Sequence, residues 1–221
     1  MQAEVNEPLK VGDEFTASLR ANLAVQNMLA AARFSRRVAE LEENNKSQEF
    51  GPFWEEILHN SIASITCCAS SLEAYANELF FDRGTIFPKY STSLLDNLWE
   101  TYERKSTLEK FEFALLLLSE KPSIDKGSIL YQNVRIVIDL RNALIHFKPE
   151  WDTEADLHRK LSNQLKYKFA PSPFLNDELI FPKRWATHGC TRWGVQSCLK
   201  FAAEFERLSS LPPKYPQSIV P

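Results

Sequence analysis

The feature that most constrains the fold is a segment from about Phe53 to Asp82 in which apolar residues recur at helical spacing. Their positions alternate steps of four and three residues, which places them on one face of an α-helix. The stripe consists of Leu58, Ile62, Ile65, Ala69, Leu72, Ala76 and Leu79. Such a seam is typical of a helix that packs lengthwise on a neighbour. A helix pair is therefore expected at the centre of the fold, with Arg83-Gly84 ending this helix.

Other segments also have helical signals, and none shows the apolar alternation of a strand. The further helices are expected at about Phe15–Asn45, Ser93–Lys105, Ser106–Leu118, Ile124–Phe147 and Cys190–Leu208. Ser106-Thr107 is suited to cap the helix that follows it. The sequence therefore predicts an all-α protein, a bundle of about five helices in a single domain over residues 1–221.

A long insert, residues 148–189, separates the central helix from the last one. It contains four prolines, and beyond 153–165 it shows no strong helical period. Its KYKF and ELIF pieces could pair as a small hairpin. The proline-rich tail, residues 210–221, is expected to be an extended arm.

Composition limits the class of protein. Hydrophobic residues make up 44% and charged residues 25%, as in ordinary globular proteins. No apolar run approaches the roughly 18 residues of a membrane span, and the acidic start MQAEVNEPLKVGDEF does not resemble a secretory signal. Cys67 and Cys68 are adjacent on an apolar helical face, as small buried hydrophobes would be. These features favour a cytoplasmic protein that is not associated with a membrane.

The net charge of −3 does not indicate nucleic-acid binding, but the charge is unevenly distributed. Between His158 and Arg192 the sequence has seven basic residues and only two acidic ones, Asp177 and Glu178. This segment therefore carries a charge of +5 and the remainder of the chain −8. Six aromatic residues are interleaved with these charges. A basic, aromatic surface suits single-stranded nucleic acid. The alternative is a loop whose aromatic residues anchor it to the bundle while its lysines stay in water.

The central helix carries an arginine on its apolar side. On a helical wheel, Arg141 projects from the middle of an apolar arc, whereas Asn142, His146 and two further charged residues share a polar sector. A buried, unpaired guanidinium costs several kcal/mol. Arg141 must therefore meet a carboxylate, a carbonyl, a second subunit or a ligand phosphate. Glu73, beside the apolar seam of the second helix, is the expected structural partner.

His146 lies in the last turn before Pro149 forbids further helix. A protonated imidazole is favoured at a helix C-terminus by about 0.3 to 1 kcal/mol. Asn142 lies one turn earlier and could orient the ring. A histidine in this place can be a cap or a catalyst, and position alone does not decide.

The motif RNALIH, with SSLEAYANELF on the preceding helix, resembles the HEPN superfamily, which has an arginine, a polar residue and a histidine near the end of a core helix. HFKPEW and THGCTRW resemble a group of uncharacterised bacterial HEPN-like proteins. The resemblance covers about residues 53–208.

The resemblance implies a metal-independent endoribonuclease that acts as a homodimer, in a toxin–antitoxin or phage-defence role. Arg141 would then bind the scissile phosphate, His146 would be the general acid or base, and Asn142 would position it. Imidazole chemistry near neutrality and a fixed guanidinium suit such a reaction. Other members of the family are non-catalytic modules that bind a partner or antitoxin protein, and the motif does not exclude this alternative.

Few other residues suggest chemistry. His188, Cys190 and Cys198 lack a fourth ligand and a usual zinc spacing, so no metal or cofactor is expected. His188, at the start of the last helix, and Lys148, just after His146, are possible supporting phosphate contacts.

Overall fold

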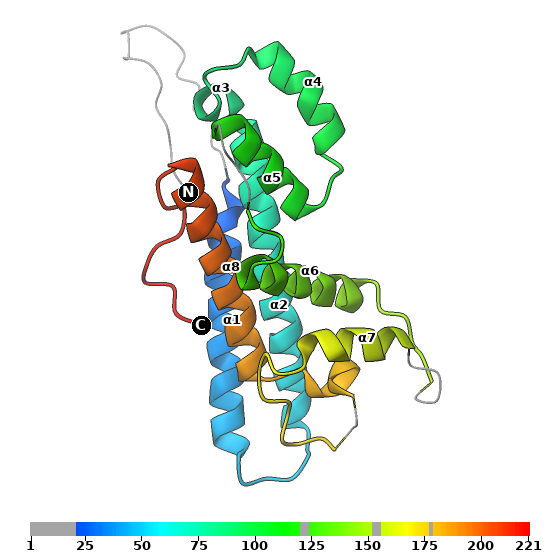
Figure 1. Ribbon diagram of the computed structural model, residues 1–221. Helices are drawn as coiled ribbons and strands as arrows, with labels where there is room; N and C mark the ends of the chain where they lie inside the picture. The colour runs from blue at the N-terminus through cyan, green and yellow to red at the C-terminus, as the bar shows by residue number, and fades with distance from the viewer. Residues whose placement is uncertain (1–20, 120–123, 152–155, 177–178) are drawn as a thin grey trace, which may run out of the picture.

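The computed structural model describes residues 21–119, 124–151, 156–176 and 179–221, and this part of the chain is helical with no β-strand (Figure 1). The all-α prediction is therefore confirmed. The α-helices are α1 (Leu23–Asn45), α2 (Phe53–Phe81), α3 (Arg83–Ile86), α4 (Thr92–Tyr102), α5 (Thr107–Leu118), α6 (Ile129–Ile145), α7 (Asp156–Leu165) and α8 (His188–Ser209). A short π-helical turn, η2 (Ile180–Arg184), precedes α8. None of these helices is long and apolar enough to cross a membrane.

Five helices form the bundle. Helices α1, α5, α6 and α8 all pack on α2, and α1, α5 and α6 also contact α8. In Figure 1, α1, α2 and α8 run side by side along the molecule, and α6 lies across them. The predicted number of about five helices matches this bundle but not the described chain as a whole, because α3, α4 and α7 lie around it.

Small side chains set the spacing between α1 and α2. The Oγ of Ser64 donates to the carbonyl of Ala31 at 2.9 Å, and Ser71 donates to the carbonyl of Ala24. Both serines are fully buried, so these bonds satisfy hydroxyl groups that are removed from water. The predicted seam lies beside them, with Ile65, Ala69, Leu72, Ala76 and Leu79 all buried.

Local signals explain where helices begin. The predicted cap at Ser106 is present as a full capping box: Glu109 N donates to Ser106 Oγ at 3.4 Å, and Ser106 N donates to Glu109 Oε2 at 2.9 Å. The first predicted helix begins at Leu23 in the described chain, and its expected start at Phe15 lies outside the described residues.

Helix α6 is shorter than the predicted span of Ile124–Phe147. It begins at Ile129 because Ser128 caps it, accepting from Tyr131 N at 3.2 Å, and because Asp125 and Gly127 form a turn before it. It ends at Ile145, and His146 is its C-cap. Pro149 offers no backbone N–H and disfavours helical geometry in the residue before it, so the chain leaves the helix here.

The insert contains no strand among its described residues, so the predicted hairpin is wrong. Lys166–Phe169 forms a turn after α7, and Phe181 belongs to η2. The two arms of the insert share a main-chain bond from Ser172 N to Arg184 O at 2.7 Å. Pro171, Pro173 and Pro182 lack the N–H groups that a ladder of such bonds needs.

The aromatic residues of the insert mostly anchor it to the bundle. Trp185 and Phe181 are buried, and Phe174 packs edge-on against Phe53 of α2 with ring centroids 5.0 Å apart. Among the described residues of the insert, Tyr167 and Trp151 are large exposed aromatics, at 89% and 79% exposure, of the kind that could stack on a base. This arrangement agrees with the anchored-loop interpretation for most of the six aromatic residues.

The tail after α8 contains no helix or strand, and it packs back onto the bundle (Figure 1). The hydroxyl of Tyr215 lies 2.9 Å from Ser71 Oγ, and Ile219 is buried. Lys214 Nζ lies 2.6 Å from Glu78 Oε2, an ion pair between the tail and α2.

Candidate functional site

Arg141 of α6 meets Glu73 of α2, as the sequence suggested. The Nη2 of Arg141 lies 3.4 Å from Glu73 Oε2 and donates a hydrogen bond to it. The arginine side chain is 18% exposed, and its Nε is buried without a hydrogen-bond partner among the described residues. Arg141 is therefore held at one end of its guanidinium, with one donor unused.

Glu73 is shared between two cations. Its Oε1 lies 3.9 Å from Nζ of Lys110, whose side chain is only 4% exposed. Lys110 also donates to Asn77 Oδ1 at 3.0 Å and lies over the ring of Trp99. One carboxylate between an arginine and a lysine leaves this cluster with a net charge of +1.

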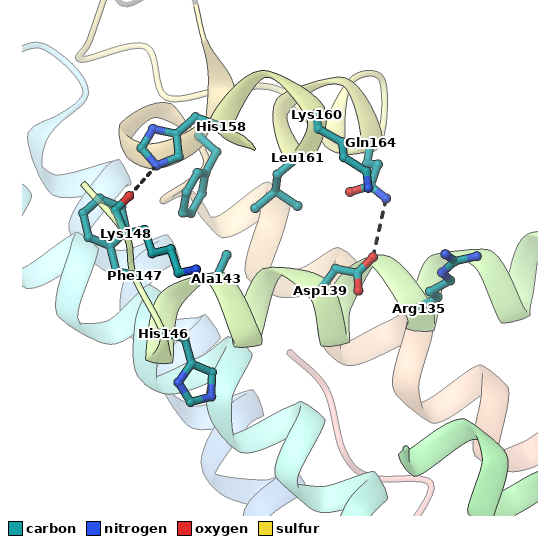
Figure 2. Close-up of a pocket in the computed structure, with 11 residues that line it drawn as sticks. Arg135, Asp139, Ala143, His146, Phe147, Lys148, His158, Lys160, Leu161 and Gln164 are labelled. Carbon is teal, nitrogen blue, oxygen red and sulfur yellow. Dashed lines mark hydrogen bonds between the residues drawn. The ribbon is translucent and has the colours of Figure 1, made fainter. Parts of the chain in front are cut away.

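Asn142 and His146 are both exposed at the end of α6. The backbone N–H of His146 donates to the carbonyl of Asn142 at 2.9 Å, which closes the last turn. Figure 2 shows the imidazole of His146 turned away from α7. The ring is therefore accessible to solvent, as a group that transfers protons to a bound molecule must be.

A pocket of about 370 Å³ lies between α6 and α7, and His146 contributes to its wall. Arg135 and Asp139 reach it from α6, and Lys160 and Gln164 reach it from α7 (Figure 2). The remaining lining residues are Ala143, Phe147, Lys148, His158, Leu161 and Phe181. Three cationic side chains and one carboxylate thus surround an opening with an apolar floor.

The structure adds His158, which the sequence did not single out. It is buried in α7, its Nε2 lies 3.1 Å from the carbonyl of Lys148, and its Nδ1 lies 3.7 Å from Glu150. Its ring stacks on Phe147 with centroids 5.5 Å apart. These contacts hold the segment that contains Lys148 beside α7. No spacing rule reveals them, because they depend on how α7 folds back.

His188 lies elsewhere. Its backbone N–H donates to Glu42 Oε1 at 2.9 Å, and its Nδ1 lies 3.1 Å from the carbonyl of Ser35, so it fastens the start of α8 to α1. It does not line the pocket beside His146. The structure therefore joins Lys148 and His146 at one pocket. It pairs Arg141 with Glu73, neither of which lines that pocket, and it keeps His188 with α1.

The cysteines are buried or half-buried free thiols. Burial raises the pKa of the Cys190 thiol well above its ordinary value, which favours the neutral form over the thiolate that binds metal. Within the described ranges, no group of three or more His, Cys, Asp or Glu side chains could hold a metal ion.

No protein-family model, no curated protein and no solved structure matches the chain.

Proposed function

We propose that the protein is a metal-independent endoribonuclease whose reaction centre is the C-terminal end of α6. The observation that carries the proposal is the exposed His146 at the end of α6, next to a pocket whose lining includes the cationic side chains of Arg135, Lys148 and Lys160. An RNA phosphate needs cations close by, and strand cleavage needs a group that exchanges protons near neutral pH. Both requirements are met at this end of the helix.

The proposed reaction is an attack of the ribose 2′-oxygen on the adjacent phosphorus. The 2′-hydroxyl loses its proton, the bond from phosphorus to the 5′-oxygen breaks, and the leaving oxygen takes up a proton. The products are a 2′,3′-cyclic phosphate and a 5′-hydroxyl. His146 exchanges one of these protons, and Asn142, one turn earlier, positions the ring.

Arg141 is proposed to stabilise the charge that develops on the phosphate oxygens. Its side chain is 18% exposed, and its ion pair with the half-exposed Glu73 is made through Nη2, which supports this role. A phosphate near Arg141 would share the guanidinium with Glu73, while Lys110 continues to neutralise Glu73.

We also propose that the active form is a homodimer joined at this end of α6. Ile145, Phe147 and Trp151 flank His146 and are 52%, 47% and 79% exposed. A second copy would cover these apolar side chains and bring two His146 rings to one cleft. The cellular role proposed is that of a toxin or a defence effector, held inactive by a partner protein.

The ion pair of Arg141 favours a second candidate function. If Arg141 serves only to hold α6 on α2 through Glu73, the protein is a non-catalytic module that binds a partner in a toxin–antitoxin or defence complex. In that case the exposed end of α6 is a docking surface and His146 is its cap.

The test compares wild type with His146→Ala on total cellular RNA and a labelled tRNA pool, in EDTA. His59→Ala is the matched control, because His59 is an exposed histidine of α2 that does not line the pocket. Cleavage by wild type and His59→Ala but not by His146→Ala, with cyclic phosphate ends, supports the ribonuclease. Equal cleavage by all three would overturn the role proposed for His146, and cleavage by none favours the binding module.

A further inference from the structure

Lys110 of α5 is a lysine whose ammonium group is almost removed from water. Its side chain is 4% exposed, and its Nζ donates to Asn77 Oδ1 at 3.0 Å and lies 5.5 Å from the ring centroid of Trp99. A buried lysine usually has a carboxylate as its direct partner. Here the short bond goes to a neutral amide, and the Glu73 carboxylate lies farther off, at 3.9 Å. The amide and the ring therefore fix the position of the charge.

Glu73 lies between this fixed charge and Arg141. Its Oε1 faces Lys110 at 3.9 Å, and its Oε2 faces Arg141 Nη2 at 3.4 Å. Hydrogen bonds between a cationic nitrogen and a carboxylate are commonly about 2.7–2.9 Å long. Both contacts are longer than this. The carboxylate is therefore attracted to cations on two helices, α5 and α6, and is tightly bonded to neither.

This arrangement leaves the guanidinium of Arg141 with spare donors. It makes one long bond to Glu73, and its buried Nε has no hydrogen-bond partner among the described residues. A carboxylate with a single cationic neighbour tends to close on it through short, paired bonds. Such bonds would occupy the N–H groups of Arg141. The attraction of Glu73 to a second cation opposes that closure.

We propose that Lys110 is a positioning residue for Arg141. Its fixed charge holds the Glu73 carboxylate between α5 and α6, so the guanidinium stays loosely paired and able to turn toward an anion. The control of this ion pair does not rest on the proposed function. Its consequence for catalysis does, because the anion is then the phosphate that gains charge in the transition state.

The first test measures the coupling between Arg141 and Glu73 by urea unfolding of Arg141→Ala, Glu73→Gln and the double variant. The cycle is run in the full wild-type chain and in a Lys110→Met background, where methionine keeps most of the side-chain length and removes the charge. In a rigid cluster this pairwise coupling does not depend on Lys110. If Lys110 holds the carboxylate back, the coupling constant should rise at least about threefold in Lys110→Met, because the pair closes.

Lys105→Met is the matched control, because Lys105 is an exposed lysine just before α5 and its loss changes the net charge equally. It should change the coupling constant less than about 1.5-fold. If thermal melting shows that Lys110→Met does not fold, Lys110→Gln takes its place, because its amide is also uncharged and can still donate to Asn77. A coupling constant that is unchanged in the uncharged variant, or that rises equally in Lys105→Met, overturns the inference.

The second test measures RNA cleavage. Lys110→Met should lower kcat at least about fivefold and change KM less than about twofold, because Arg141 acts on charge that develops only in the transition state. Adding Glu73→Gln should return kcat to within about twofold of wild type, since it removes the carboxylate that has captured Arg141. If Lys110 only packs α5, a change in α2 does not repair its loss.

The two tests separate this role from the proposed function. A coupling constant that rises in Lys110→Met, while wild type cleaves no RNA, leaves the role of Lys110 standing and removes the ribonuclease. Cleavage by wild type with an equal coupling constant in both backgrounds does the reverse. Undiminished cleavage by Lys110→Met beside a raised coupling constant overturns the link between Lys110 and catalysis.

Discussion

Arg141 donates a hydrogen bond to Glu73 across 3.4 Å, and this contact fastens the end of α6 to the middle of α2. The carboxylate is 41% exposed and also lies 3.9 Å from the nearly buried ammonium of Lys110. The pair is therefore a half-buried ion pair at the edge of the core. Its energetics differ from those of a fully buried pair, for which loss of one partner costs about 3–5 kcal/mol.

Arg141→Ala should lower the free energy of unfolding by only about 1 kcal/mol, the scale of a single partly exposed ion pair. Urea unfolding of Arg141→Ala, Glu73→Gln and the double variant gives the coupling, expected at about 0.5–1 kcal/mol. A loss above about 3 kcal/mol would contradict this account of the pair.

The contact between Arg141 and α2 could be predicted from the sequence. Which of the two carboxylates of α2 is taken by another group could not. An arginine on an apolar arc needs an anion, and the neighbouring helix offers Glu73 and Glu78. In the structure, Glu78 forms an ion pair with Lys214 of the tail and accepts a hydrogen bond from the N–H of Ala24 at the start of α1. That assignment depends on where the tail returns, and an extended proline-rich segment carries no periodic signal of its path.

The pocket between α6 and α7 could not be predicted from the sequence either. Arg135, Asp139 and His146 belong to the polar sector predicted for α6, but nothing in their spacing indicates that α7 lies opposite. Lys160 and Gln164 enter the site only because the insert folds back and Leu161 and Phe181 are buried beneath it. The hairpin prediction failed for the same reason, since short apolar pieces acquire their structure from the surface they cover.

Gly194 of α8 lies against Ile65 of α2, and a Cβ added at residue 194 would come 2.7 Å from Ile65 Cδ1. Gly194→Ala should destabilise the protein by about 1 kcal/mol, because overpacking costs about 1–3 kcal/mol and the helix gains up to about 1 kcal/mol from alanine. Ile65→Val removes the clashing methyl group and normally costs about 0.5–1.5 kcal/mol. In the Gly194→Ala background it should cost less or stabilise. Additive effects in chemical unfolding would show that the helices separate instead.

Phe174 anchors the insert through its edge-on contact with Phe53. Phe174→Ala should increase the rate of limited proteolysis within residues 156–176, because the contact and its buried area hold this arm by about 1–2 kcal/mol. Tyr167→Ala is the control: Tyr167 is 89% exposed and its removal should leave the rate unchanged. Equal rates for wild type and Phe174→Ala would place the anchor elsewhere, at Phe181 or Trp185.

The hydrogen bond between Glu42 and the backbone at the start of α8 should make the free energy of unfolding depend on pH. Burial raises the pKa of Glu42 above its ordinary value of 4.5, although the N–H of His188 donates to the carboxylate and opposes the shift. A carboxyl whose pKa is raised by folding stabilises the folded state in its neutral form. That contribution is complete below the unfolded pKa and is lost as pH rises through the folded pKa.

Glu42→Gln keeps an oxygen that can accept from His188 N and removes the buried charge. The variant should therefore melt above wild type at about pH 7, and the difference should shrink as pH falls below the unfolded pKa of Glu42, because the carboxyl then becomes neutral in both states. Glu204 is the matched control, because its hydrogen bonds to Arg207 lower its pKa. Glu204→Gln should melt slightly below wild type at about pH 7, and this difference should also close on acidification. Thermal melts of wild type and the two variants between about pH 4 and 7 measure the sign of each shift in melting temperature. If Glu42→Gln melts below wild type at neutral pH, the ionised carboxylate at the α8 N-terminus is the stabilising form.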